Sequence, residues 1–160
     1  MEVIWNKIYT LHPEDSKTNL CVAIPVDRDF WCLEFLCSYT PKILEDREKS
    51  RELITEGLKK YVPDKFMDQY SNWENYLPVV NLITLSIDYR DSYLGCAHRH
   101  APEQRHIICK EFASPGFFRH AAAKGPWRAV INIHAVVCDS VAYHLTVRGW
   151  DKGEKDFVAL

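Results

Sequence analysis

Two histidines, His134 and His144, lie in a stretch of alternating apolar and polar residues, 128–150 (RAVINIHAVVCDSVAYHLTVRGW). Two alternating runs that meet at a short turn are typical of a β-hairpin. Side chains alternate between the two faces of a strand, so an odd-length loop over residues 138–140 is needed to bring both apolar sets onto one face. In that register His134 lies directly opposite His144.

The predicted polar face of this hairpin suits acid-base chemistry or phosphate binding. Unperturbed imidazoles titrate near neutral pH, and two that face each other across strands can share a proton. The same face would carry Asn132, Thr146 and Arg148, which could orient an anionic substrate. The alternative is structural: the face packs against other elements or is solvated, and neighbouring groups satisfy both rings.

A short motif overlaps this face. Residues 144–147 (HLTV) match one His-x-Thr-apolar element, and the two-histidine phosphoesterases carry two such elements on neighbouring strands. Here the second copy is absent, because His134 is followed by Ala135 and Val136. We therefore assign the chain to no family.

A second set of residues could bind zinc, which favours thiolate and imidazole ligands. The candidates lie on two arms joined by a short loop, and they are Cys96, His98, His106 and Cys109. The spacing differs from the usual paired ligands, and His106 and Cys109 would face opposite sides of a strand. We therefore favour the metal-free alternative, in which this is an exposed, histidine-rich hairpin loop.

Two surfaces could bind a partner without a metal. In the metal-free alternative, Arg99, His100 and Arg105 form a small basic patch for an anionic partner. Near Ser114-Pro115-Gly116 lie aromatic residues of the kind that anchor protein interfaces, and they are Phe117, Phe118 and Trp127.

Composition limits the function classes. The chain has 160 residues, 47% of them hydrophobic, which is enough for one core and predicts a single domain, 1–160. A net charge of -2 does not indicate a nucleic-acid or membrane partner. Because the sequence shows no signal peptide and no apolar run long enough for a membrane span, we expect an intracellular protein with reduced cysteines.

The elements that would position these residues follow from hydrophobic periodicity. Residues 1–11 and 19–26 read as strands, and Pro25 must lie at a sheet edge or a strand end. Residues 28–40, 42–62 and 64–76 show helical spacing, the last with an aromatic stripe expected to be buried. Strands follow from residue 79 onward. The expected core of the hairpin is Ile131, Ile133, Ala135, Val137, Val141, Tyr143, Leu145 and Val147.

The predicted fold is therefore α+β: a mostly antiparallel sheet, two or three helices from residues 28–76 covering one face, and the C-terminal β-hairpin at the centre. Two functions fit it. The first is a small binding or adaptor module that uses the histidine- and cysteine-rich loop and the aromatic loop, with a protein partner or an anionic small ligand. The second is a small phosphoester-directed hydrolase or nucleotide-binding protein that uses the histidine pair.

Overall fold

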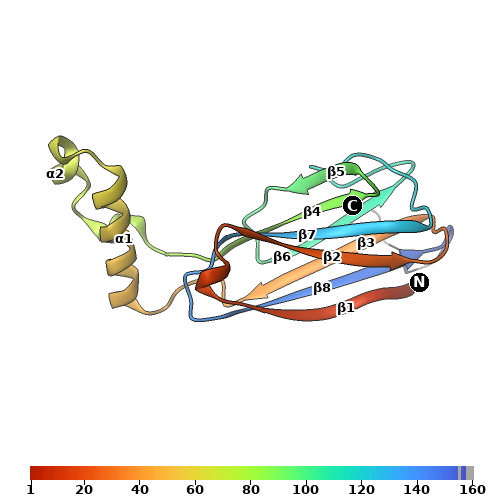
Figure 1. The fold of residues 1–160 in the computed structure, drawn as a ribbon, viewed down its shortest axis with the longest axis horizontal. Coiled ribbons are helices and arrows are strands. Elements are labelled where there is room, and N and C mark those ends of the chain that lie inside the picture. Colours follow the sequence, from red (N-terminus) through yellow and green to blue (C-terminus); the bar gives the residue numbers. More distant parts are fainter. Residues whose placement is uncertain (155, 158–160) are drawn as a thin grey trace.

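The computed structural model, which describes residues 1–154 and 156–157, is an α+β structure whose eight strands form two antiparallel sheets packed face to face (Figure 1). Sheet A has the order β1-β8-β3-β6 and sheet B the order β2-β7-β4-β5. The strands are β1 (Glu2–Leu11), β2 (Thr18–Val26), β3 (Cys32–Thr40), β4 (Leu82–Tyr89), β5 (Ser92–Ala97), β6 (Glu103–Cys109), β7 (Gly125–Ala135) and β8 (Val141–Trp150).

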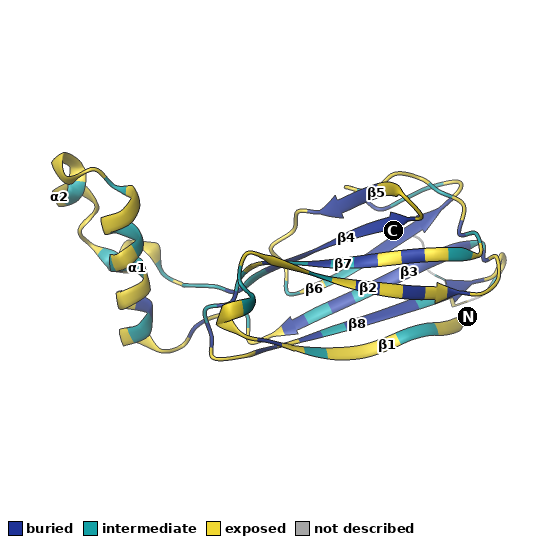
Figure 2. Cartoon of the chain, in the orientation of Figure 1, coloured by how far each residue is buried: buried dark blue, intermediate teal, exposed yellow. Residues whose placement is uncertain are grey.

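The alternation in the sequence places apolar side chains between the two sheets. Burial follows the strands in Figure 2, where the inward-facing residues of β7 and β8 are buried. Six of the eight core residues expected in this region are buried: Ile131, Ile133, Val141, Tyr143, Leu145 and Val147. Ala135 and Val137 are only half-buried, because the alternation changes after β7 and Val136 and Cys138 point inward instead.

The predicted hairpin of residues 128–150 is wrong, because β7 belongs to sheet B and β8 to sheet A. Residues 136–140 carry the chain from one sheet to the other as a β-arch. Asn81 holds this crossing: its side-chain oxygen accepts from the backbone N–H of Val137 at 2.7 Å, and its amide donates to the carbonyl of Pro41 at 2.9 Å. Strand β8 is nevertheless central in sheet A, as β7 is in sheet B.

Most connections between consecutive strands cross from one sheet to the other. Among the described residues, the turn at Arg90 and Asp91 between β4 and β5 is the one connection that stays within a sheet. Strands β1 and β2, which the sequence suggested as a second hairpin, are the edge strands of opposite sheets. The placement of Pro25 at a sheet edge is confirmed, since β2 ends sheet B.

The helices do not cover a sheet face. Helix α1 (Arg47–Tyr61), capped by Asp46, and α2 (Met67–Tyr70) form an arm that projects from one end of the sandwich (Figure 1). The helix expected within residues 28–40 is strand β3, which is buried on both faces and so has apolar residues at helical as well as strand spacing. The arm leaves part of its aromatic stripe exposed, namely Phe66, Tyr70 and Tyr76.

The two sides of the sandwich are closed differently. On one side, residues 113–118 bridge the edges of both sheets: Ser114 N–H donates to the carbonyl of Ile107 at 2.9 Å, and Phe118 N–H to that of Leu94 at 2.7 Å. A Cβ at Gly95 would lie 2.1 Å from the carbonyl oxygen of Gly116, so this close approach requires glycine.

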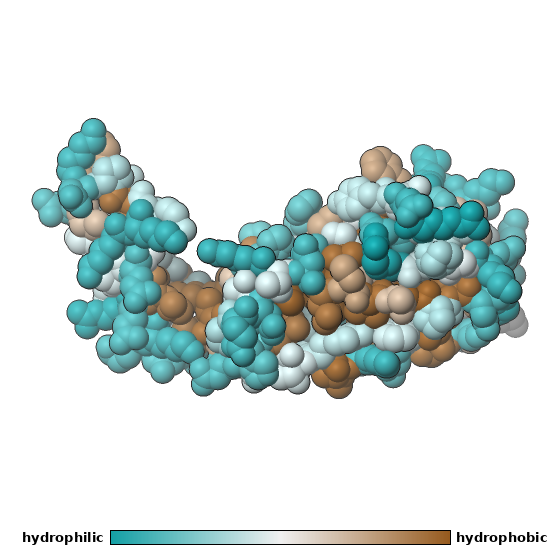
Figure 3. Space-filling view, viewed as in Figure 1, coloured by the Kyte–Doolittle hydropathy of each residue, from teal (hydrophilic) through white to brown (hydrophobic). Residues whose placement is uncertain are grey.

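On the other side, apolar side chains reach the surface between polar flanks, where β1 and β2 lie (Figure 3). The side chains that line this shallow apolar hollow include Trp5, Ile24 and Pro25. No helix within the described part of the chain has the length and apolar composition to cross a membrane.

Candidate functional site

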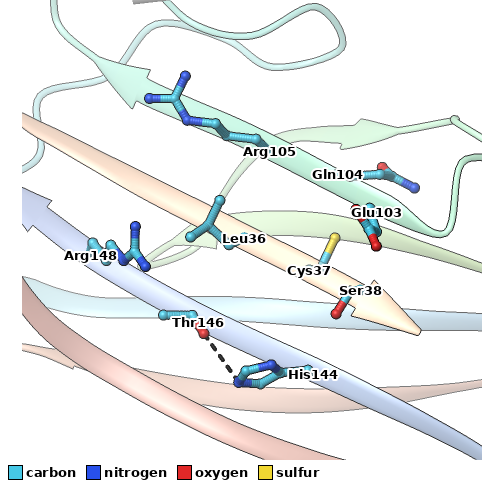
Figure 4. A pocket seen from close by; sticks show the side chains of 9 residues that line it. All are labelled: Leu36, Cys37, Ser38, Glu103, Gln104, Arg105, His144, Thr146 and Arg148. Carbon is cyan, nitrogen blue, oxygen red and sulfur yellow. Dashed lines mark hydrogen bonds between the residues drawn. The ribbon is translucent and has the colours of Figure 1, made fainter. Parts of the chain in front are cut away.

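The outer face of sheet A carries a groove of about 470 Å³ (Figure 4). The register of the sheet explains its walls, because Leu36 on β3 lies between Thr146 and Arg105, and Ser38 lies between His144 and Glu103. Residues of β3, β6 and β8 therefore meet on one surface. The lining residues are Leu36, Cys37, Ser38, Glu103, Gln104, Arg105, His144, Thr146 and Arg148.

A buried carboxylate organises one end of this groove. Glu34 is 2% exposed and lies on the outer face of β3, directly opposite Arg148. It accepts hydrogen bonds from Arg105 Nε and, at 3.1 Å, from the indole of Trp150, and its second oxygen lies 3.5 Å from Nη1 of Arg148. A buried carboxylate is tolerable only with such partners. Two guanidinium groups thus contact the carboxylate of Glu34.

The Arg148 guanidinium keeps donor capacity. Its Nε is buried, and within the described residues it has no hydrogen-bond partner. Buried N–H groups are nearly always paired with protein, water or ligand, so an unpaired one on the wall of a groove needs an explanation. The planar guanidinium fork matches the oxygens of a carboxylate or phosphate group. Arg148 is therefore suited to bind an anionic group.

In the middle of the groove, the lining residues His144 and Thr146 both contact Asn6. His144 Nε2 hydrogen-bonds to the side-chain oxygen of Asn6 on β1, and the Thr146 hydroxyl donates to the same oxygen at 3.2 Å. An amide oxygen can only accept, so Nε2 carries the ring proton when His144 is neutral. The Nδ1 atom is then the ring nitrogen that can accept a hydrogen bond from a ligand.

The groove continues past His144 into a second hollow of about 380 Å³. The two hollows share Ser38, Glu103 and His144. The far hollow reaches Lys42, whose ammonium donates to the hydroxyl of Tyr39 at 2.8 Å. An elongated polar surface thus runs along β3 and β8.

The structure separates the predicted histidine pair. His144, Thr146 and Arg148 line the groove on sheet A. His134 and Asn132 lie on the outer face of sheet B, on the opposite side of the sandwich. There His134 Nε2 is 2.9 Å from the hydroxyl of Thr84, and Asn132 donates to Ser86 at 2.7 Å. The expected cross-strand pair is therefore wrong, because the alternation is equally satisfied when two strands face each other across a core.

The four zinc candidates are not brought together either. Cys96 lies on the outer face of sheet B, and Cys109 on the outer face of sheet A opposite Cys32. His106 lies in β6, 5.0 Å from the ring of Phe117, and His98 is exposed in the loop after β5. Across residues 1–154 and 156–157, no group of three or more His, Cys, Asp or Glu side chains is placed to hold a metal ion.

His106 is instead a buried, neutral histidine. Its Nε2 lies 3.0 Å from the side-chain oxygen of Gln104, whose amide donates to the carbonyls of Arg99 and Ala101. Nε2 must therefore be the donor, and the unprotonated Nδ1 is buried without a partner within the described chain. Burial, with a smaller contribution from the Arg99 cation, lowers the pKa of His106 to about 4.

The predicted partner-binding residues are dispersed. Trp127 is a core residue, 1% exposed, whose indole donates to the carbonyl of Ala123 at 2.8 Å, so the prediction of a surface anchor is wrong. Phe117 is half-buried, whereas Phe118 is 66% exposed beside the start of β5. Arg99 and His100 are exposed beyond the end of β5, and Arg105 belongs to the groove.

Sequence reasoning missed the lining residues Ser38 and Glu103, and it also missed Asn6 and Glu34, which contact lining residues. One signal was present for Glu34, which is a single acidic residue in the apolar run 30–37 (FWCLEFLC). A lone carboxylate in a buried strand requires a cationic partner. The other three residues carry no such signal, because only the strand order places Asn6 and Ser38 beside β8 and Glu103 beside β3.

Comparisons with known proteins add no assignment. No family model matches the chain, and no curated protein does. Among solved structures, the chain matches the crystal structure of GEBA250068378 from Sulfurospirillum deleyianum with a TM-score of 0.33 and 12% sequence identity, over 89% of this chain and 97% of that chain.

Proposed function

We propose that this chain is a binding module that holds an anionic ligand in the groove on the outer face of sheet A. One observation carries the proposal: Arg148, on the wall of the groove, has a buried Nε without a partner in the described chain. Burying a donor unsatisfied is costly, and a carboxylate or phosphate oxygen would remove that cost.

The rest of the groove supports the same ligand chemistry. Arg148, with its guanidinium held near Glu34, would contact the anionic group without much loss of side-chain freedom. His144 would add a hydrogen bond or, when protonated, a second positive charge beside the ligand. Leu36 offers an apolar floor between these polar walls. Binding pockets commonly combine apolar walls with a few oriented polar groups.

The hydrolase alternative loses its basis, since it needed His134 and His144 as neighbours. In the groove, His144 is one imidazole beside Thr146 and Asn6, and no described residue supplies a second imidazole to its lining. Binding demands only complementary charge and shape, whereas catalysis demands a complete set of groups. We therefore propose binding as the function.

The proposal is tested by NMR titration of ¹⁵N-labelled protein with inorganic phosphate and, separately, with succinate. We expect saturable shifts at residues of β3, β6 and β8 around Arg148, and little change on sheet B. His144→Ala should weaken the shifts, and His134→Ala is the matched control, since it removes an outer-face histidine from the other sheet. Shifts that are equal on both sheets, or absent for both anions, would contradict the proposal.

A further inference from the structure

A pair of cysteines lies outside the groove, near the end of sheet A. Cys32 on β3 and Cys109 on β6 are direct partners in the antiparallel register. Both are fully buried, and both are free thiols in this structure. The proposed binding function uses neither of them.

The register also shows which kind of pair they form. Tyr39 N–H donates to the carbonyl of Pro102 at 3.0 Å, and the β3–β6 register runs without a shift from Ser38 to Cys32. Hydrogen-bonded and non-hydrogen-bonded pairs alternate along an antiparallel ladder, so Tyr39 marks the odd-numbered positions of β3 as hydrogen-bonded. Cys32 and Cys109 therefore form a non-hydrogen-bonded pair.

This position suits a disulfide. In a non-hydrogen-bonded pair the two Cα atoms lie about 4.5 Å apart, and the side chains approach closely. This separation falls within the range of about 4.4–6.8 Å that disulfides span. The two side chains belong to the same buried cluster, and Cys109 Sγ donates to the carbonyl of Phe112 at 3.2 Å. The bond can form without a change of register.

We propose that Cys32 and Cys109 are a redox-active pair that forms a reversible disulfide in the presence of a peroxide. One thiol sulfur attacks a peroxide oxygen, the O–O bond breaks, and the products are a sulfenic acid and one water when hydrogen peroxide is the oxidant. The second thiol then attacks the sulfenic sulfur, the S–S bond forms, and the second water leaves. The two thiols lose two electrons and two protons, which reduce the peroxide to water.

Aromatic side chains pack around the pair. Phe157 lies 5.0 Å from Trp31 and 5.3 Å from Trp150, measured between ring centroids, and Phe112 joins the same cluster. Burial, and to a smaller degree the hydrogen bond to Cys109, raises the pKa of Cys32, so little thiolate forms while the cluster is closed. Opening of this cover should therefore limit the rate of oxidation.

The experiment uses Cys21→Ser protein, because Cys21 is the exposed cysteine and would form intermolecular disulfides. After treatment with hydrogen peroxide, intact mass should fall by about 2 Da. A non-reducing peptide map should show Cys32 joined to Cys109, and dithiothreitol should reverse the change. Cys21→Ser/Cys109→Ala is the matched control, in which this crosslink cannot form and circular dichroism verifies the fold.

A second variant tests the proposal in case the aromatic cluster makes oxidation of the two thiols slow. Phe157→Ala in the Cys21→Ser background removes part of the aromatic cover, and we expect faster formation of the same disulfide. The proposal is overturned if both folded proteins keep Cys32 and Cys109 as thiols after peroxide treatment, or if the crosslink joins other cysteines. Neither readout depends on ligand binding, so it is separate from the test of the groove.

Discussion

Replacing His106 with glutamine should remove a specific part of the acid sensitivity of the fold. The folded chain holds this ring neutral, with Nε2 donating to Gln104 and Nδ1 buried without an acceptor among the described residues. Protonation would place a charge and a new N–H in that environment. Glutamine is also neutral and polar, but it does not titrate in this range.

The magnitude follows from the pKa of His106, which falls from an ordinary value of 6.5 to about 4. Between these values the unfolded chain binds a proton and the folded chain does not, so the free energy of unfolding decreases as pH falls through this window. At 1.36 kcal/mol per pKa unit, the loss attributable to this side chain is about 3 kcal/mol. Below the folded pKa both states are protonated, and the loss stops growing.

The assay is urea unfolding of wild-type and His106→Gln protein at several pH values from 7 to 4. We expect the variant to be less stable at pH 7, where it loses packing against Phe117, and to lose less stability on acidification. Carboxylates titrate in both proteins and cancel in the difference. Parallel pH profiles, or an NMR titration of the His106 ring with a midpoint near 6.5, would refute the reasoning.

Three further outcomes are expected. Glu34→Gln should lower the free energy of unfolding, measured with urea, by about 3–5 kcal/mol, because two guanidinium groups lose their buried carboxylate. The exposed control Glu103→Gln should change this free energy by less than about 0.5 kcal/mol. Equal effects of the two substitutions would contradict the buried network. Leu145→Ala should cost about 2–5 kcal/mol by opening a cavity between the sheets, and a near-zero effect would place it outside the core. His134→Ala should leave the NMR signals of the His144 ring unchanged, since the two rings lie on opposite faces of the sandwich, and a clear shift of these signals would contradict the β-arch.

The sequence predicted which face of each C-terminal strand is buried, but not which strand lies beside it. Alternation identified Ile131, Ile133, Tyr143 and Leu145 as core residues. The same alternation fits a hairpin, in which apolar faces lie side by side, and a β-arch, in which they face each other across a core. The local pattern does not distinguish these arrangements, because the difference comes from long-range pairing with β1, β2, β3 and β4.

This ambiguity decided which site residues could be found. His144, Thr146 and Arg148 share one strand face in either arrangement, so their grouping survived. His134 was grouped with them only because a hairpin was assumed, and in the structure it lies on the other sheet. Residues such as Asn6 and Glu103 became neighbours of β8 or β3 through the strand order of sheet A, which the sequence alone does not reveal.

The helix expected within residues 28–40 failed for a related reason. Strand β3 is interior in sheet A and buried on both faces, so most of its positions are apolar. Its apolar residues therefore fit the two-residue period of a strand and also the 3.6-residue period of a helix. A continuous apolar run cannot distinguish a buried strand from a helix by periodicity. A helix within residues 42–62 was predicted correctly in kind, because the charged residues at helical spacing in this segment have no strand interpretation; it is α1 in the structure.

The most direct test of the proposed anion groove is the dissociation constant for inorganic phosphate in Arg148→Gln protein compared with Arg128→Gln protein. Arg128 is the matched control, because its Nε donates to Asp88 at 2.8 Å on the outer face of sheet B. Loss of a charged hydrogen bond costs about 1.5–3 kcal/mol, so we expect Arg148→Gln to weaken binding about tenfold or more and Arg128→Gln to leave it unchanged. Equal affinities in the two variants would contradict a ligand site at Arg148.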